Sequence, residues 1–227
     1  MASETIKIGV ILEGDEEECL FDIVSSCLGF GKDLDVVPIN AGGAPNVPAY
    51  FQDCYTDPSY DCVVAVYDTD NRAKDIASPF SQVKNKLEEI LGDSLSVEKI
   101  SFCTNPTILQ LLLLGCDTQD NVALTSSTKS GNSSLVSKYW PKISKKYVNG
   151  KQIKKGYDAS KWQLEIIKNS YIYNNEPSYE AENLLSRSLS LSFDYLNNCP
   201  AGNVGLLIKA LVENDKELFE DIKKHIY

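Results

Sequence analysis

Histidine is almost missing from this chain, since His225 is the only one among 227 residues and lies two residues from the end. A Ser-His-Asp triad, a Cys-His pair and a histidine-ligated zinc centre all depend on that side chain. These chemistries are therefore excluded almost completely. Any catalysis must use carboxylates, lysines, hydroxyls or a metal bound by oxygen ligands, and such ligands favour Mg²⁺, Mn²⁺ or Ca²⁺.

Long apolar runs and closely paired cysteines are also lacking. The longest apolar run, around residues 111–114, is too short to span a bilayer, and residues 1–4 lack the basic and then apolar start of a signal peptide. The seven cysteines include no C-x-x-C pair, and most of them stand beside apolar residues. We therefore expect reduced, buried thiols, a cytoplasmic location and no membrane partner.

Two apolar stretches each lead into acidic residues. The stretches are residues 6–12 and 62–67, and the acids that follow them are Glu13, Asp68 and Asp70. Because ligands of open parallel α/β sheets gather at the carboxyl edge, we expect these three carboxylates to converge there. Asp68 and Asp70 face the same side if the extended geometry persists. Since clustered carboxylates repel unless a cation lies between them, the pattern predicts a site for Mg²⁺ or Mn²⁺.

Strand and helix signals alternate through the first 116 residues. The expected strands are residues 6–12, 35–39, 61–67 and 97–103, and the expected helices are residues 16–28, 46–56, 79–91 and 105–114. Such alternation with short links implies a parallel sheet with helices on both faces. Residues 117–227 show helical periodicity and few strand signals. We therefore predict an α/β domain over residues 1–116, with a mostly helical C-terminal region over residues 117–227 packed on it.

The charge is distributed unevenly along the chain. The net charge is −10, yet residues 129–168 carry ten lysines against two acids, a balance of +8, so the remaining residues carry −18. An acidic, metal-binding body with one basic segment fits an enzyme that acts on phosphodiesters. The alternative is a lysine-rich, solvated helical face without a nucleic-acid partner.

The order of these features resembles a TOPRIM domain, the metal-dependent catalytic module of topoisomerases, primases and several nucleases. Three short segments resemble its RloB-like branch more closely, namely residues 40–43 (Asn-Ala-Gly-Gly), residues 67–71 (Tyr-Asp-Thr-Asp-Asn) and the pair Asn105 and Pro106 before a Leu-rich helix. That branch comprises small bacterial proteins associated with restriction and phage-defence loci. The resemblance implies a TOPRIM/Rossmann-like sheet, a magnesium-dependent nuclease, and nucleic acid (DNA or RNA) as the partner.

Roles for individual residues follow from the resemblance and the chemistry together. Asp68 and Asp70 would hold one or two metal ions, and Glu13 would be a further ligand or the general acid/base. Glu17, one helical turn on, would support the metal site, and Gly14 would allow close approach of backbone to phosphate. The candidate contacts to the nucleic-acid backbone are Lys145, Lys146, Lys154 and Lys155. The acids Asp15, Glu16 and Glu18 are assigned to a favourable helix N-terminus.

Two other functions stay open on the sequence. One is a non-catalytic TOPRIM-fold sensor or partner subunit of a defence system, because the RloB-like pattern usually has a glutamate just after the Asn-Pro pair. Here those positions read Thr107, Ile108, Leu109 and Gln110. The other is a HAD-type phosphatase with Asp68 as nucleophile and Asp70 as acid. The sequence also leaves open a homo-oligomer and a protein partner from the same defence system.

Overall fold

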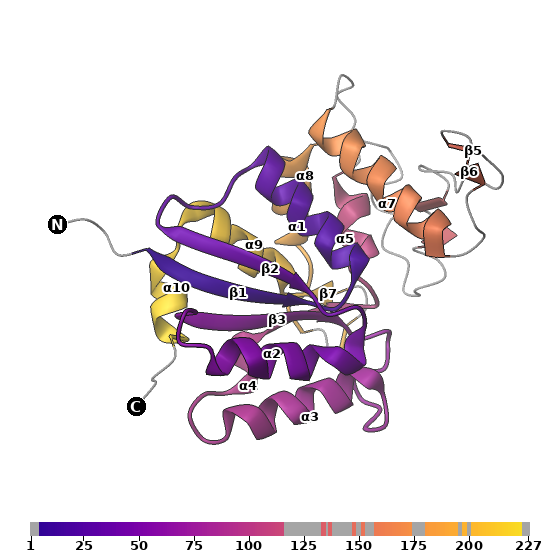
Figure 1. The fold of residues 1–227 in the computed structure, drawn as a ribbon. Helices are drawn as coiled ribbons and strands as arrows, with labels where there is room; N and C mark the ends of the chain where they lie inside the picture. Colours follow the sequence, from indigo (N-terminus) through magenta and orange to yellow (C-terminus); the bar gives the residue numbers. More distant parts are fainter. Residues whose placement is uncertain are drawn as a thin grey trace.

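The computed structural model describes residues 5–115, 133–134, 136–137, 147–148, 151–152, 157–173, 180–194, 197–198 and 201–223. A five-stranded sheet lies at the centre of this part of the chain (Figure 1). Its strands are β1 (Ile6–Leu12), β2 (Leu34–Asn40), β3 (Cys62–Asp68), β4 (Ser101–Asn105) and β7 (Ala201–Gly202). They run in the order β2-β1-β3-β4-β7, and every neighbouring pair is parallel except β4 and β7.

Helices cover the sheet on both faces. α2 and α3 lie on one side, and α1, α5 and α7 lie on the other (Figure 1). The helical bounds are α1 (Asp15–Cys27), η1 (Ala44–Asn46), α2 (Val47–Thr56), α3 (Pro79–Leu91), α4 (Val97–Ile100), α5 (Leu109–Leu114), α7 (Tyr157–Ile172), α8 (Ala181–Ser188), α9 (Val204–Glu213) and α10 (Lys216–Asp221). β5 (Tyr147–Val148) and β6 (Lys151–Gln152) form a separate two-stranded sheet.

The central strands are apolar because both of their faces are covered. All seven residues of β3 are buried, and in β1 only Lys7 is partly exposed. Such continuous apolar strands are typical of parallel sheets between two helical layers, whereas a sheet with one wet face shows alternation. The predicted α/β class with a mostly parallel sheet is therefore confirmed, and the predicted positions of the first three strands agree with the structure to within two residues.

One predicted strand, residues 97–103, is wrong in its first half. Residues 97–100 form the short helix α4, and the strand β4 begins at Ser101. Val97 and Ile100 are both buried, and their spacing of three places them on one helical face. Glu98 and Lys99 between them are exposed, so the apolar residues follow a helical period over this turn, and four residues are too short for that period to be distinguished from the apolar strand that follows.

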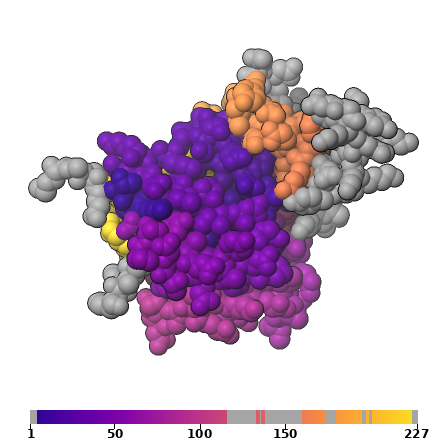
Figure 2. All heavy atoms as spheres, in the orientation of Figure 1, coloured from indigo at the N-terminus to yellow at the C-terminus, as the bar shows by residue number. Residues whose placement is uncertain are grey.

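The C-terminal region contributes more to the sheet than its helical pattern predicts. β7 adds an antiparallel edge to β4, and α9 packs close to β4. α7 lies along α1 (Figures 1 and 2). Its Ile167 and Tyr171 are buried in the core. A two-residue strand carries too little pattern to be recognised locally, so the long-range pairing determines it.

The helices that the structure describes include none with both the length and the apolar character needed to cross a membrane.

Candidate functional site

The carboxyl ends of β1 and β3 are joined through Glu13. These strands are parallel neighbours, with Leu12 in register with Val66. The Glu13 amide donates to the Val66 carbonyl at 3.0 Å, and Glu13 Oε2 accepts from the Asp68 amide at 3.0 Å. The Glu13 carbonyl in turn accepts from the Gly43 amide at 2.6 Å. Glu13 is therefore held at the sheet edge by hydrogen bonds to the end of β3 and to the turn that follows β2.

Glu17 lies at the same edge on the first turn of α1. Its Oε2 accepts from the Gly14 amide at 2.9 Å, so Glu17 satisfies a backbone donor at the helix start. The side chain is buried although it is an acid. Asp15, Glu16 and Glu18 occupy the same first turn, which confirms their predicted place at a helix N-terminus. A Cβ built on Gly14 would meet only Glu17 Oε2, at 3.8 Å, so this backbone position has room beside it.

Asp68 is the last residue of β3 and is held from the neighbouring strand. Its Oδ1 accepts from Thr104 Oγ1 at 2.6 Å and from the Ile108 amide at 2.8 Å. Only 8% of the residue is exposed. A buried carboxylate with short hydrogen bonds from fixed donors has a well-defined orientation.

These acids share one pocket of about 300 Å³. Its lining residues are Glu13, Gly14, Asp15, Glu16, Glu17, Gly42, Gly43, Asp68, Ser160 and Leu164. Among these described residues five are acids and none is basic. The pocket therefore has a strongly negative potential, which favours cations and disfavours an anionic ligand that arrives without one.

Burial and mutual repulsion act on two of these carboxyl groups. The pKa of Glu17 is raised well above its usual value, first by burial and then by the charges of Asp68 and Glu13. The pKa of Asp68 is also raised, by burial and by Glu13, while hydrogen bonds from the Thr104 and Thr107 side chains lower it. Ionisation of either carboxyl group therefore costs free energy, and a bound cation would offset this cost.

We expect a stability that falls with rising pH in the metal-free protein. Because the folded-state pKa values of Glu17 and Asp68 are raised, the folded state binds more protons than the unfolded state above the usual acid range. The melting temperature should therefore decrease as the pH rises from about 4 toward the raised pKa values. Melts in chelator across this range test the sign, with Glu17→Gln as the variant. A Glu17→Gln profile as steep as that of wild type would contradict the assignment to Glu17.

Asp70 lies differently from the other predicted acids. β3 ends at Asp68, and Asp70 and Asn71 have positive φ angles of 51° and 63°. The Asp70 amide donates to the Pro106 carbonyl at 3.0 Å. The extended geometry that would place Asp70 on the side of Asp68 does not persist, and Asp70 is not among the residues that line the acidic pocket.

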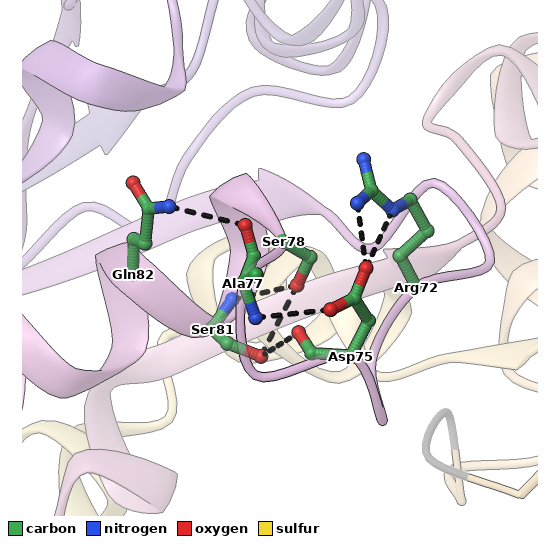
Figure 3. Close-up of polar contacts among 6 residues, drawn as sticks. All are labelled: Arg72, Asp75, Ala77, Ser78, Ser81 and Gln82. Carbon is green, nitrogen blue, oxygen red and sulfur yellow. Dashed lines mark hydrogen bonds and ion pairs between the residues drawn. The ribbon is translucent and has the colours of Figure 1, made fainter.

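The loop after Asp70 is held by its own polar contacts, as Figure 3 shows. Arg72 pairs with Asp75 at 2.5 Å, and Asp75 Oδ1 accepts from the Ala77 amide at 2.9 Å. Ser81 Oγ donates to the Asp75 carbonyl at 2.8 Å, which fixes the loop to the start of α3. The left-handed turn at Asp70 is therefore followed by an ordered connection to α3.

Two pocket residues come from α7, a helix that no sequence motif connects to the site. Ser160 and Leu164 lie on α7 and line the same pocket as the acidic strand ends. α7 packs on α1, where Lys161 pairs with Asp15 at 3.5 Å and Lys168 with Asp22 at 3.3 Å. Two lysines of the basic segment therefore contact acids of α1. No local motif marks Ser160 or Leu164, because only the packing of α7 brings them to the pocket.

The predicted nucleic-acid contacts Lys145, Lys146, Lys154 and Lys155 lie outside the described residues. Among the described residues, no three His, Cys, Asp or Glu side chains are already arranged to hold a metal ion. Comparisons with protein-family models, curated proteins and solved structures give no match to this chain.

The fold and the site by themselves define an α/β protein with an acidic pocket at the carboxyl edge of a mostly parallel sheet.

Proposed function

We propose that this protein is a magnesium-dependent nuclease that cleaves phosphodiester bonds of DNA or RNA at the acidic pocket. The observation that carries the proposal is the gathering of Glu13, Glu17 and Asp68 around one pocket at the ends of β1 and β3. The resemblance to TOPRIM proteins of the RloB-like branch supports the same function, with a role in defence against phages.

The donor set fits a hard divalent cation. Carboxylate oxygens are the ligands that Mg²⁺ and Mn²⁺ prefer, and Mg²⁺ keeps several water molecules that need room. The pocket of about 300 Å³ offers such room beside Glu13 and Asp68. When bound, the metal would stabilise the charge that develops on the phosphate oxygens. Glu13 and Asp68 would hold it with Glu17 in support, and Asp70 would join them if its loop moves toward the pocket.

The test is cleavage by the purified full chain. Supercoiled DNA, single-stranded DNA, tRNA and a single-stranded RNA are each incubated with Mg²⁺, with Mn²⁺ and with chelator. We expect cleavage of at least one polynucleotide with a metal and none with chelator. Absence of cleavage on all four with either metal, also in the presence of the proteins encoded beside it, would contradict the proposal.

We expect lysines of the basic segment, residues 129–168, to bind the phosphates of the polynucleotide. Changing Lys154 and Lys155 to Glu should weaken binding and reduce the dependence of log K on log salt by about 0.7–0.9 for each phosphate that is no longer neutralised. The matched control makes the same charge change at Lys32 and Lys86, which are exposed and lie outside the basic segment of residues 129–168. Binding titrations from about 50 to 200 mM salt distinguish the two pairs. Equal weakening in both would indicate a general charge effect in place of specific binding by Lys154 and Lys155.

A second candidate is a cation-binding partner subunit without catalysis. It is favoured by the place of Asp70 outside the pocket lining, and by the absence of a preassembled set of three metal ligands among the described residues. Such a subunit would bind Mn²⁺ and a defence-system protein without cutting nucleic acid. Metal binding without cleavage, together with complex formation with that protein, would select this function over the nuclease.

A further inference from the structure

Thr104 is a polar neighbour of Asp68 on the adjacent strand. β3 and β4 are parallel, and Asp68 is in register with Thr104, so both side chains lie on the same face of the sheet. Thr104 Oγ1 donates to Asp68 Oδ1 at 2.6 Å, and Thr104 is fully buried. The hydroxyl of Thr104 therefore has a fixed place beside the carboxyl group.

The second donor to Asp68 reaches the same oxygen. The Ile108 amide donates to Oδ1 at 2.8 Å, from the connection between β4 and α5. Both bonds therefore approach Asp68 from the β4 side, whereas the acidic pocket lies on the side of Glu13 and Glu17. Oδ1 is therefore engaged by two donors, and the Thr107 side chain, from the same connection, also hydrogen bonds to the Asp68 carboxyl group.

We propose that Thr104 is a positioning residue that fixes the orientation of the Asp68 carboxyl group at the pocket, where this group would bind the cation. This inference rests on the proposed function, because it concerns the same metal site. Partners that hydrogen bond to a ligating carboxylate fix its orientation, and their removal typically reduces metal affinity about 10–100-fold. Without the Thr104 hydroxyl, Asp68 would keep the bonds from the Ile108 amide and the Thr107 side chain but would lose the bond from the neighbouring strand, so its carboxyl group would be held less firmly.

The experiment compares three substitutions in the full chain. Thr104→Val removes the hydroxyl and keeps the shape, whereas Thr104→Ser keeps the hydroxyl. The matched control is Ser101→Ala, on the same strand, which removes a buried hydroxyl that bonds the Tyr67 hydroxyl at 3.0 Å away from the pocket. Mn²⁺ affinity is measured by calorimetry, and Mg²⁺-dependent cleavage is measured in parallel.

We expect a Mn²⁺ dissociation constant about 10–100-fold higher for Thr104→Val, and one within about threefold of wild type for Thr104→Ser. Ser101→Ala should lose stability and keep its metal affinity. Should Thr104→Val not fold, Thr104→Ala gives the same comparison with Thr104→Ser. Wild-type affinity in Thr104→Val or Thr104→Ala, or an equally weakened affinity in Ser101→Ala, would overturn the role of Thr104.

The outcomes also separate this inference from the proposed function. A wild type that binds Mn²⁺ but cuts no polynucleotide contradicts the nuclease, and the affinities of the Thr104 variants still decide the positioning role. A wild type that binds no Mn²⁺ overturns both.

Discussion

Asp68→Asn is expected to reduce metal-dependent cleavage by about 1,000-fold. A metal ion contributes several kcal/mol to the stabilisation of a phosphoryl transition state, and each step of about 1.36 kcal/mol corresponds to a factor of ten in rate. Asn keeps the shape of the side chain and an Oδ1 that still accepts from Thr104 Oγ1 and the Ile108 amide. The change therefore removes the charge of one ligand while the hydrogen bonds that position the side chain remain.

The measurement is the single-turnover cleavage rate with saturating Mg²⁺. Asp93→Asn is the control, since Asp93 is exposed and lies outside the pocket lining. Asp70→Asn separates two arrangements of the site. A decrease as large as that of Asp68→Asn would show that Asp70 enters the pocket in the active complex, and a small decrease would assign the metal to Glu13, Glu17 and Asp68. Wild-type activity in Asp68→Asn would contradict the proposed site.

The second large effect is expected in thermal melts with and without Mn²⁺. A ligand at about 100 times its dissociation constant stabilises the folded state by about 2.7 kcal/mol. For a chain of this size, about 1 kcal/mol shifts the melting temperature by about 2–4 °C, so wild type should melt about 5–10 °C higher with the metal. Asp68→Asn should show little of this shift, because it lacks one ligand charge.

Without metal, Asp68→Asn should raise the melting temperature instead of lowering it. The Asp68 carboxyl is buried and repelled by Glu13, and both effects raise its pKa. Asn removes the charge and the repulsion, so Asp68→Asn in chelator should melt above wild type near neutral pH. We therefore expect the order of the two melting temperatures to reverse. Asp68→Asn should be more stable than wild type without Mn²⁺ and less stable than wild type with it. Equal metal shifts in both proteins would exclude Asp68 as a ligand.

Local pattern was sufficient to predict the central strands and the two acids that follow them. The sequences of β1 and β3 are apolar on both faces of the strand, which is typical of strands that lie between two layers of helices. Since parallel neighbours end at the same edge, the place of Glu13 beside Asp68 followed from strand order alone. Local pattern was insufficient at residues 97–100, where a single helical turn directly precedes a buried strand and is too short to show a clear period.

Asp70, Ser160 and Leu164 mark where tertiary structure was needed. A side chain two residues after Asp68 keeps the same side only in an extended strand, and the hydrogen bond from the Asp70 amide to the Pro106 carbonyl holds the backbone in a left-handed turn. Ser160 and Leu164 reach the pocket only because α7 packs on α1.

The sequence by itself therefore determined the α/β class, the acidic character of the sheet edge and the exclusion of histidine chemistry, because each depends on residue type and short-range period. Tertiary structure decided which acids share the pocket, which donors hold Asp68 and which C-terminal helix contributes to the pocket lining. These features bring residues as far apart in the sequence as Asp68 and Leu164 to one pocket. Packing and long-range hydrogen bonds determine this arrangement, and a local pattern encodes neither.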